Sequence, residues 1–533
     1  KIWGNKKQLQ EWNDLFKIAH IEKLGSTEFT KKLKNKHLHL PLDTKFFTDQ
    51  FKWDLLTALT QNNNLEEILD GVLIRSDNYQ GLNLIKKRWI NKINLIYIDP
   101  PFNTGSKDFP YKNDYLESSW LTSIYNGLVK AKEILNKEGN IFVRIDTTGN
   151  HFIRFLLDQV FGKSNFRNEI IINKTKAKKQ IKKPFIQQSE SLFFYSKNDN
   201  YFFNQVEIPR KEPKWYELLD FPRSNENPRT IMGKEYFPPR NRRWGLSQDR
   251  INLFEKKGKI RINKNKRYID CRGNLINEKP ELYYDIEPVR NVWLDIPGYS
   301  QVHKFSTENS EELLRRVIES GSKEKDVVLD FFLGSGTTTA TAHKLNRKWI
   351  GVEIGAQFED YILPRMKTVL MGDKSGISKS NNTKSSGFFK YQYLEQFEDT
   401  LENVEFNLHD YKKILKIDDI KNPFCYKMKI LENQNTKNVN VDLIESFNYL
   451  IGIFVKTMKQ VKNNGRTYIF IIGNVDKSHI GIVWRSIIDI DLQQDKIIIE
   501  ENLNDLTIDE LYVNGPCVVK GIKSIEIELN RLI

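Results

Sequence analysis

One apolar stretch that runs straight into two prolines constrains the fold more than any other part of this chain. Residues 93–98, Ile-Asn-Leu-Ile-Tyr-Ile, have the pattern of a parallel strand covered on both faces. Asp99, Pro100, Pro101 and Phe102 follow directly. Proline fixes φ, and the carboxyl ends of parallel strands are where open α/β sheets bind ligands. The stretch therefore predicts either a stiff turn or a ligand pocket at the edge of an α/β sheet.

The side chains of this tetrapeptide suit a planar ring that carries an exocyclic amine. Asp99 offers acceptor oxygens, and Phe102 offers a flat face for stacking. The simpler interpretation is a strand followed by an X-Pro-Pro turn. The tetrapeptide alone does not decide between the two.

A second strand-and-loop motif lies far downstream. Residues 327–330 predict a buried strand, and a glycine-containing turn then leads into a helix that begins near Thr339. The next strand, 349–352, ends in Glu353, at a spacing that lets an acid reach ribose hydroxyls in dinucleotide folds. The loop residues expected at a cofactor are Asp330, Phe331, Phe332, Gly334, Ser335, Gly336 and Thr337.

The loop chemistry discriminates between cofactors. Its sequence is G-S-G-T-T rather than G-x-G-x-x-G, and Asp330 precedes the glycines. An anion there would repel a pyrophosphate but could pair with the cationic amino-acid part of S-adenosylmethionine. The loop therefore favours S-adenosylmethionine over NAD, and a Walker loop is excluded because no Gly-Lys-Ser/Thr follows. The alternative is a tight strand–helix turn without a ligand.

Composition adds a polyanionic partner to this prediction. The 533 residues carry a formal charge of +14, which favours nucleic acid, although a Lys- and Asn-rich proteome would contribute to the same excess. The three cysteines are widely spaced, which argues against a metal site or disulfide framework. No apolar run reaches membrane-spanning length, so we expect a cytoplasmic protein without a membrane partner.

The two motifs together resemble the β class of amino-methyltransferases, in which the acceptor motif precedes the cofactor motif and a target-recognition domain lies between them. Several further stretches resemble modification subunits of type III restriction–modification systems: 102–105, 372–378, 388–395, 447–450, 483–485 and 512–515. The resemblance implies an α/β fold: a Rossmann-like S-adenosylmethionine-dependent methyltransferase sheet, an inserted target-recognition domain and a C-terminal α+β domain.

The resemblance also implies a double-stranded DNA substrate, a site and a reaction. Asp99 and the Pro100 carbonyl would accept the amine protons of a flipped adenine, Phe102 would stack on the base, and the methyl group would pass directly to N6. Residues 74–83 look like the segment that contacts the cofactor adenine, which assigns that role to Asp77 and Asn78, and Thr307 would contact the methionine end. Phe102 stands where the family more often has Tyr, and Asn309-Ser310 stand where it has Lys-Pro.

The pattern along the chain predicts six segments. Alternating strands and helices (72–74, 79–90, 93–98, a helix 120–135 closed by Gly139, and 141–143) precede a stretch rich in Pro, Arg and aromatics. The predicted segments are a helical lead-in 1–70, the first methyltransferase part 71–175, a target-recognition domain 176–300, the second methyltransferase part 301–371, an exposed linker 372–387 and a C-terminal domain 388–533 with strands at 468–472, 481–484 and 496–499.

The insertion carries the basic clusters that we expect to contact DNA phosphates. The candidate residues are Lys174, Lys176, Lys178, Lys179, Lys182, Lys183, Arg240, Arg242 and Arg243. For any single lysine, a solvated surface is the competing interpretation.

Three functions remain open. The first is the modification subunit of a type III-like system, a homodimer with a separate helicase–nuclease restriction subunit. The second is a solitary adenine methyltransferase, and the third is a DNA-recognition subunit that recruits a nuclease. A nicotinamide oxidoreductase is nearly excluded by the loop chemistry. The C-terminal domain has no catalytic constellation and is interpreted as a dimerisation and partner-docking domain.

Overall fold

The computed structural model describes most of the chain. The described residues are 2–18, 37–105, 113–174, 187–218, 227–300, 302–303, 305, 307–379, 383–396, 399, 420–432 and 435–532. They divide into two compact units: Lys1–Asn204 together with Asn291–Ile533, and Gln205–Arg290.

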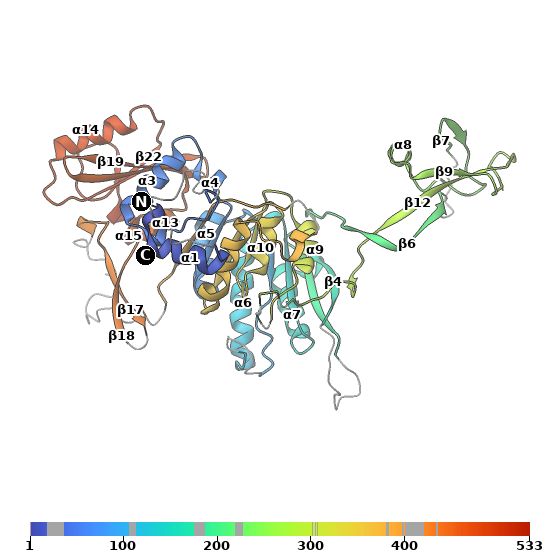
Figure 1. The fold of residues 1–533 in the computed structure, drawn as a ribbon, viewed down its shortest axis with the longest axis horizontal. Coiled ribbons are helices and arrows are strands. Elements are labelled where there is room, and N and C mark those ends of the chain that lie inside the picture. The colour runs from blue at the N-terminus through green and yellow to red at the C-terminus, as the bar shows by residue number, and fades with distance from the viewer. Residues whose placement is uncertain are drawn as a thin grey trace. The chain divides into compact units, whose positions relative to one another are not determined.

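A nine-stranded sheet forms the centre of the first unit (Figure 1). In spatial order its strands are β13 (Val292–Trp293), β4 (Phe166–Asn173), β5 (Ser189–Ser196), β3 (Leu135–Ile145), β2 (Ile93–Ile98), β14 (Val327–Asp330), β15 (Lys348–Glu353), β1 (Gly71–Arg75) and β16 (Phe389–Tyr393). The strands from β3 to β16 are mutually parallel, whereas β5 runs antiparallel to both β3 and β4. The predicted parallel α/β sheet is therefore confirmed.

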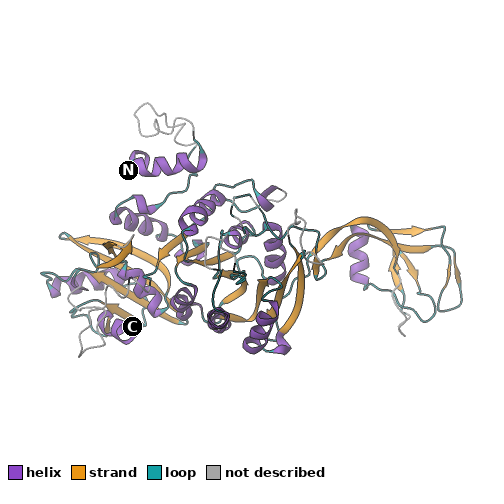
Figure 2. Ribbon diagram, turned by 90° about the horizontal axis from the view of Figure 1, so that it is seen from below, coloured by secondary structure: helices purple, strands orange, loops and turns teal. Residues whose placement is uncertain are grey.

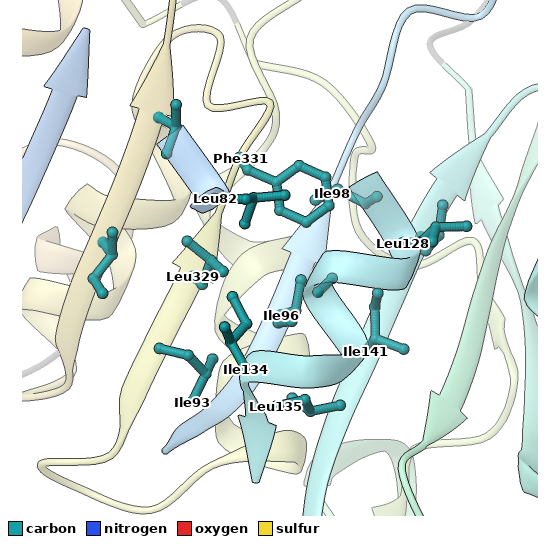
Figure 3. Close-up of a cluster of buried hydrophobic side chains, with 14 of the residues drawn as sticks. Leu82, Ile93, Ile96, Ile98, Leu128, Ile134, Leu135, Ile141, Leu329 and Phe331 are labelled. Carbon is teal, nitrogen blue, oxygen red and sulfur yellow. The ribbon is translucent and has the colours of Figure 1, made fainter. Parts of the chain in front are cut away.

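Helices cover both faces of this sheet. The strands alternate their side chains, so Ile96 and Ile98 of β2 face one layer, where they join a cluster with Leu128 and Ile134 (Figure 3). On the other face, a Cβ added to Gly321 at the end of α9 (Glu311–Gly321) would lie 2.8 Å from the Leu95 side chain. Helix α9 therefore packs closely against the sheet. The helices are α5 (Asn78–Trp89), α6 (Glu117–Ile134), α7 (Asn150–Phe161), α9 (Glu311–Gly321), α10 (Thr337–Lys344) and α11 (Leu363–Leu370), with short turns η4 (Lys163–Asn165), η5 (Phe358–Ile362) and η6 (Gly376–Lys379).

Some predicted boundaries in this unit are wrong. The insertion was expected to begin at 176, but β5 lies between β3 and β4 in the main sheet, and the separate unit spans only Gln205–Arg290. Likewise β16 pairs with β1, so the strand at the predicted start of the C-terminal domain belongs to the main sheet. Gly139 does not close a helix, because it lies within β3. Residues 372–387 are not simply an exposed linker, since Ile377 is fully buried there.

The second unit has its own sheet and core. Its strands β6 (Glu207–Glu217), β12 (Lys279–Pro288) and β9 (Ile260–Asn263) form an antiparallel sheet, and α8 (Gln248–Lys256) accompanies it (Figure 2). Short hairpins pair β7 (Arg229–Ile231) with β8 (Lys234–Tyr236) and β10 (Tyr268–Ile269) with β11 (Leu275–Ile276). Buried Ile231, Trp244 and Leu282 lie in one apolar cluster, so this predicted insertion is a folded domain and not merely irregular chain.

The C-terminal part is α+β, as predicted. Its sheet has the order β19 (Phe454–Asn463), β20 (Arg466–Val475), β21 (Ser478–Arg485), β22 (Glu510–Val513) and β23 (Ile522–Ser524), with α13 (Leu443–Ile451), α14 (Leu492–Leu503), α15 (Ile525–Leu532) and the hairpin β17 (Lys427–Glu432)–β18 (Asn435–Asn440). The strands expected at 468–472 and 481–484 are confirmed. The strand expected at 496–499 is wrong, because those residues lie in α14, whose N-cap Asp491 accepts from two backbone N–H groups.

The described N-terminal residues are helical, in agreement with the sequence. They form η1 (Ile2–Gly4), α1 (Lys6–Phe16), η3 (Thr44–Phe46), α3 (Asp49–Thr60) and α4 (Leu65–Ile68). Helix α3 packs against β19, where the Thr60 hydroxyl donates to the Met458 carbonyl at 3.0 Å. Among the helices that the structure describes, none combines the length and apolar character that crossing a membrane requires.

Candidate functional site

The two sequence motifs meet at one edge of the central sheet. Strands β2 and β14 are parallel neighbours, with Leu329 opposite Ile96. Asp330 ends β14 and Asp99 follows β2, so both carboxylates lie at the shared carboxyl edge. From here the chain crosses to β3 on one side and to β15 on the other, which makes this edge a topological switch point, the usual ligand site of an open α/β sheet.

Asp99 presents one anchored and one unpartnered oxygen. Its Oδ2 accepts a hydrogen bond from Asn309 Nδ2 at 2.9 Å. Its Oδ1 is buried and has no hydrogen-bond partner among the described residues. Burial raises the pKa of Asp99 to about 6, although the nearby guanidinium of Arg144 opposes the rise. A buried acceptor without a donor is unfavourable unless a ligand supplies one, so Oδ1 marks a place for an N–H group.

The loop after Asp99 is fastened to its surroundings. The Pro101 carbonyl accepts from Trp120 Nε1 at 2.8 Å, and Phe102 packs partly against the main apolar cluster. Asn103, with φ of 55°, exchanges hydrogen bonds with the backbone of Tyr115, and its own N–H donates to Asn113. The predicted stiffness of the loop thus comes from these bonds as well as from the prolines.

Asp330 is held at the start of the glycine loop. Its Oδ1 accepts from the Phe332 N–H at 2.9 Å and its Oδ2 from the Thr338 hydroxyl at 2.6 Å. Burial raises its pKa to about 7, those two bonds oppose the rise, and the charge of Asp99 adds to it. The charge of Asp99 therefore reaches Asp330 and disfavours its ionised form.

Within the loop, the glycines and the neighbouring side chains differ in what they leave for a ligand. Gly334 and Gly336 have positive φ, and a Cβ on Gly334 would meet nothing closer than the Phe332 carbonyl oxygen at 4.0 Å, so the space beside it is open. Phe331 instead points into the apolar cluster (Figure 3). Ser335 and Thr337 are buried, with Arg365 donating to the Thr337 hydroxyl at 2.9 Å. For these three residues a ligand contact would have to come from the backbone.

The remaining predicted cofactor residues lie at the same edge or beside it. Asp77 caps α5, and Asn78 is its first residue. The Glu353 carboxylate accepts from the N–H groups of Gly334, Ile354 and Gly355, and burial raises its pKa. Thr307 is half-buried in the segment that precedes α9.

The predicted DNA-binding residues are not all in one place. Lys174 follows β4 in the first unit, where its partly exposed side chain forms an ion pair with the buried Glu190 at 3.2 Å. Its phosphate contact stays a prediction. Lys176, Lys178, Lys179, Lys182 and Lys183 lie outside the described residues. Arg240 and Arg242 are exposed and Arg243 is half-buried in the second unit.

Sequence reasoning missed the groups behind Asp99. Arg144, at the carboxyl end of β3, is fully buried and donates to Glu190 of β5 through Nε at 2.9 Å and Nη2 at 2.6 Å. Burial alone would raise the pKa of Glu190, but Arg144 and Lys174 hold it below its ordinary value. The available signal was a charged residue within or directly beside the apolar run of each strand: Arg144 in 141–145 and Glu190 just before 192–195. A charge buried in a strand requires a partner.

The acidic side chains at this edge of the sheet fit a cofactor that lacks a pyrophosphate. Acidic side chains end β14 and β15 and follow β1 and β2, which suits hydroxyl and ammonium groups rather than phosphates. The open space at Gly334 gives a ligand close access to the backbone. Among the described residues, no group of three or more His, Cys, Asp or Glu side chains could hold a metal ion.

Fold and site together define an α/β protein with its ligand site at the switch point of a parallel sheet. The chain belongs to the N6_N4_Mtase family of DNA methylases, which matches residues 93–364, from β2 through the start of α11. The resemblance to amino-methyltransferases drawn from the motifs is confirmed.

Curated relatives agree with this family. The chain is 30% identical over 415 residues to the probable type III restriction–modification enzyme HindVI Mod subunit of Haemophilus influenzae, an alignment that covers 62% of this chain and 55% of that protein. It is 26% identical to the EcoPI Mod subunit of Escherichia phage P1, covering 54% of this chain and 56% of that protein. The chain thus spans about half the length of these two relatives.

Solved structures give a weaker likeness. A putative DNA modification methylase, TTHA0409 of Thermus thermophilus, shares 15% identity and a TM-score of 0.33 over 61% of this chain and all of that one. The M1.HpyAVI–SAM complex gives 16% and 0.31 over 56% of this chain and 98% of that one. Scores at this level do not establish a shared fold.

Proposed function

We propose that this chain transfers a methyl group from S-adenosylmethionine to the exocyclic N6 of an adenine in duplex DNA. The observation that carries the proposal is the buried, unpartnered Oδ1 of Asp99 beside the glycine loop. Family membership supports the reaction class, and the names of the HindVI and EcoPI subunits support a DNA substrate.

The chemistry needs an oriented acceptor more than a strong base. The adenine N6 lone pair is delocalised into the ring, so N6 is a weak nucleophile. Asp99 Oδ1 would accept one amine proton and the Pro100 carbonyl the other, which localises the lone pair and directs it toward the methyl carbon. Phe102 would stack on the base. S-adenosylmethionine supplies, when bound, a methyl group on an already activated sulfonium. The C–S bond would break as the N6–C bond forms, S-adenosylhomocysteine would leave as the neutral thioether, and N6 would lose one amine proton along its hydrogen bond to Asp99.

Residues at the carboxyl edge would hold the cofactor. Asp330 would pair with its ammonium group, directly or through a water, and Glu353 would accept from its ribose hydroxyls. Asp77, Asn78 and Thr307 are assigned to the cofactor by the resemblance, with Asp77 and Asn78 at the adenine and Thr307 at the methionine end. An adenine inside a duplex cannot reach this edge, so the target base must leave the stack.

We further propose that the chain is the modification subunit of a type III-like system, a homodimer that works with a separate helicase–nuclease subunit. The names of the HindVI and EcoPI relatives support this context. The C-terminal part would then serve dimerisation and docking. A helicase–nuclease reading frame next to this one would agree with that proposal, and its absence would favour a solitary methyltransferase.

The test of the proposed reaction is transfer of labelled methyl from S-adenosylmethionine to random-sequence duplex DNA. Label in the DNA supports the enzyme. Sequence-specific binding without any label would contradict the proposal and favour a DNA-recognition subunit.

The pKa of Asp99 predicts a pH dependence of the chemical step. Accepting an amine proton requires the ionised carboxylate, and burial raises its pKa to about 6. The single-turnover rate should therefore rise with pH through that value and level off above it, with about a tenfold loss one unit below. A rate that stays constant through this range would contradict the assigned role of Asp99.

The exposed arginines of the second unit predict a salt-dependent DNA contact. Replacing both Arg240 and Arg242 with Gln should weaken duplex binding and reduce the slope of log affinity against log salt by about one for each phosphate that the protein no longer neutralises. Cofactor binding should not change. The charge-matched control replaces Lys6 and Lys7, which are exposed on α1 of the first unit. Equal effects in both variants would contradict a specific contact.

A further inference from the structure

Asn309 connects the buried arginine of β3 to the proposed catalytic aspartate. Arg144 Nη1 donates to Asn309 Oδ1, and Asn309 Nδ2 donates to Asp99 Oδ2 at 2.9 Å. Asp99 and Asn309 are 210 residues apart in sequence, so this is a tertiary contact between the acceptor loop and the segment that enters α9.

The direction of the Asn309 amide is fixed by its neighbours. A guanidinium can only donate, so the amide oxygen must face Arg144 and the NH₂ group must face Asp99. An NH₂ group also only donates, so the Asp99 oxygen that it contacts has to accept. A proton on Asp99 is thereby confined to Oδ1, and ionised Asp99 presents Oδ1 as its remaining acceptor.

Backbone contacts hold Asn309 in the position from which its amide reaches Asp99. Asn309 forms a β-bridge with Tyr299, and the Ser300 N–H donates to the Glu308 carbonyl at 2.7 Å. Arg144 Nη1 also donates to the Gly298 carbonyl at 2.9 Å. The same arginine therefore fixes both the amide of Asn309 and the backbone segment opposite it.

A buried acid, Glu190, pairs with Arg144 on the side away from Asn309. Glu190, fully buried, binds the other side of the Arg144 guanidinium, and the Tyr299 hydroxyl donates to Glu190 at 2.9 Å. Glu190 supplies the direct ion pair of Arg144, so the guanidinium is paired without contacting Asp99. The neutral amide between them can transmit orientation without forming a direct Arg–Asp pair that would occupy the acceptor oxygen.

We propose that Asn309 is a positioning residue that keeps Asp99 Oδ2 anchored and Oδ1 directed at the substrate amine. The proposal rests on the proposed function. Asn309 is one of the two residues that stand where the family has Lys-Pro. Loss of the Asn309 hydrogen bonds should slow the chemical step and leave substrate binding unchanged.

The test compares Asn309→Leu with wild type in steady-state and single-turnover methyl transfer. Leucine keeps the approximate volume and removes both hydrogen bonds. We expect kcat to fall about ten- to a hundredfold, as for loss of a hydrogen bond to a charged group. KM for DNA and for the cofactor should change by less than about twofold. The apparent pKa of the chemical step should rise, because the Asn309 bond favours the ionised form of Asp99.

A second variant keeps the test decisive if Asn309→Leu does not fold. Asn309→Asp preserves shape but places a second carboxylate against Asp99, so the apparent pKa should rise further through like-charge repulsion. The matched control is Asn165→Leu, because Asn165 is also half-buried, accepts from Arg167 at 3.3 Å and donates to two backbone carbonyls, at the opposite edge of the sheet.

The outcomes separate the two proposals. Wild-type kcat and pH profile in both Asn309 variants would overturn the positioning role and leave the proposed function intact. A reduced kcat with a shifted profile, absent in Asn165→Leu, supports it. If wild-type protein transfers no methyl group, the proposed function fails and the positioning role fails with it.

Discussion

Asp99→Asn should lower the rate of methyl transfer by about 10²- to 10³-fold, the loss typical of removing one oriented electrostatic partner from an active site. Asn309 Nδ2 requires an acceptor, so the new side chain would turn its carbonyl oxygen toward Asn309. Its NH₂ group would then face the substrate amine, and two donors would meet where a donor and an acceptor are needed.

Duplex binding and cofactor binding should persist in this variant, measured by fluorescence anisotropy and calorimetry. The matched control is Asp158→Asn. Asp158 lies on α7, accepts a hydrogen bond from the Tyr195 hydroxyl at 2.6 Å and has no part in the proposed site. Transfer at the wild-type rate in Asp99→Asn would show that another group orients the amine.

Asp330→Asn should weaken cofactor binding by about ten- to a hundredfold, because it removes a charge-assisted partner of the cofactor ammonium. The effect should depend on pH. Since the pKa of Asp330 is raised to about 7 by burial, wild-type affinity should fall as pH drops through that value. The asparagine variant should lack this dependence. Calorimetric titration of S-adenosylmethionine over this range measures both effects, and equal affinities at all pH values would contradict the assignment.

The thermal midpoint shows whether weaker cofactor binding by Asp330→Asn comes from unfolding. The folded-state pKa of Asp330 lies above its ordinary value, so the folded protein holds a proton that the unfolded chain releases. The contribution of Asp330 to stability is therefore lost as pH rises from its ordinary pKa of 3.8 to about 7. The amide of the Asp330→Asn variant does not ionise, so the thermal midpoint of that variant above this range should equal or exceed that of wild type.

Local sequence predicted the central sheet well because its strands and helices have strong, distinct periodicities. The apolar run before Asp99 and the strand before Asp330 are both buried strands, and the expected order of strand, glycine turn and helix holds at 327–345. General topology then required two parallel strand ends to lie at one edge. What sequence could not supply was that these two strands are direct neighbours.

Most of the misses depend on long-range contacts, and one depends on a helix cap. Residues 189–196 lie in the main sheet because they pair with β3 and β4, which no local pattern encodes. Asn309 looked like a departure from a motif, and only the fold brings it against Asp99. The stretch 496–499, Lys-Ile-Ile-Ile, fits a strand equally well, but a helix cap upstream favours the helix.

The most direct test of the account identifies the methylated base. Duplex DNA is incubated with S-adenosylmethionine and either wild-type protein or Asp99→Asn, digested to nucleosides and analysed by mass spectrometry. The account predicts N6-methyladenine with wild type and a strongly reduced yield with Asp99→Asn. Methylation on cytosine N4, or equal N6-methyladenine from both proteins, would contradict it.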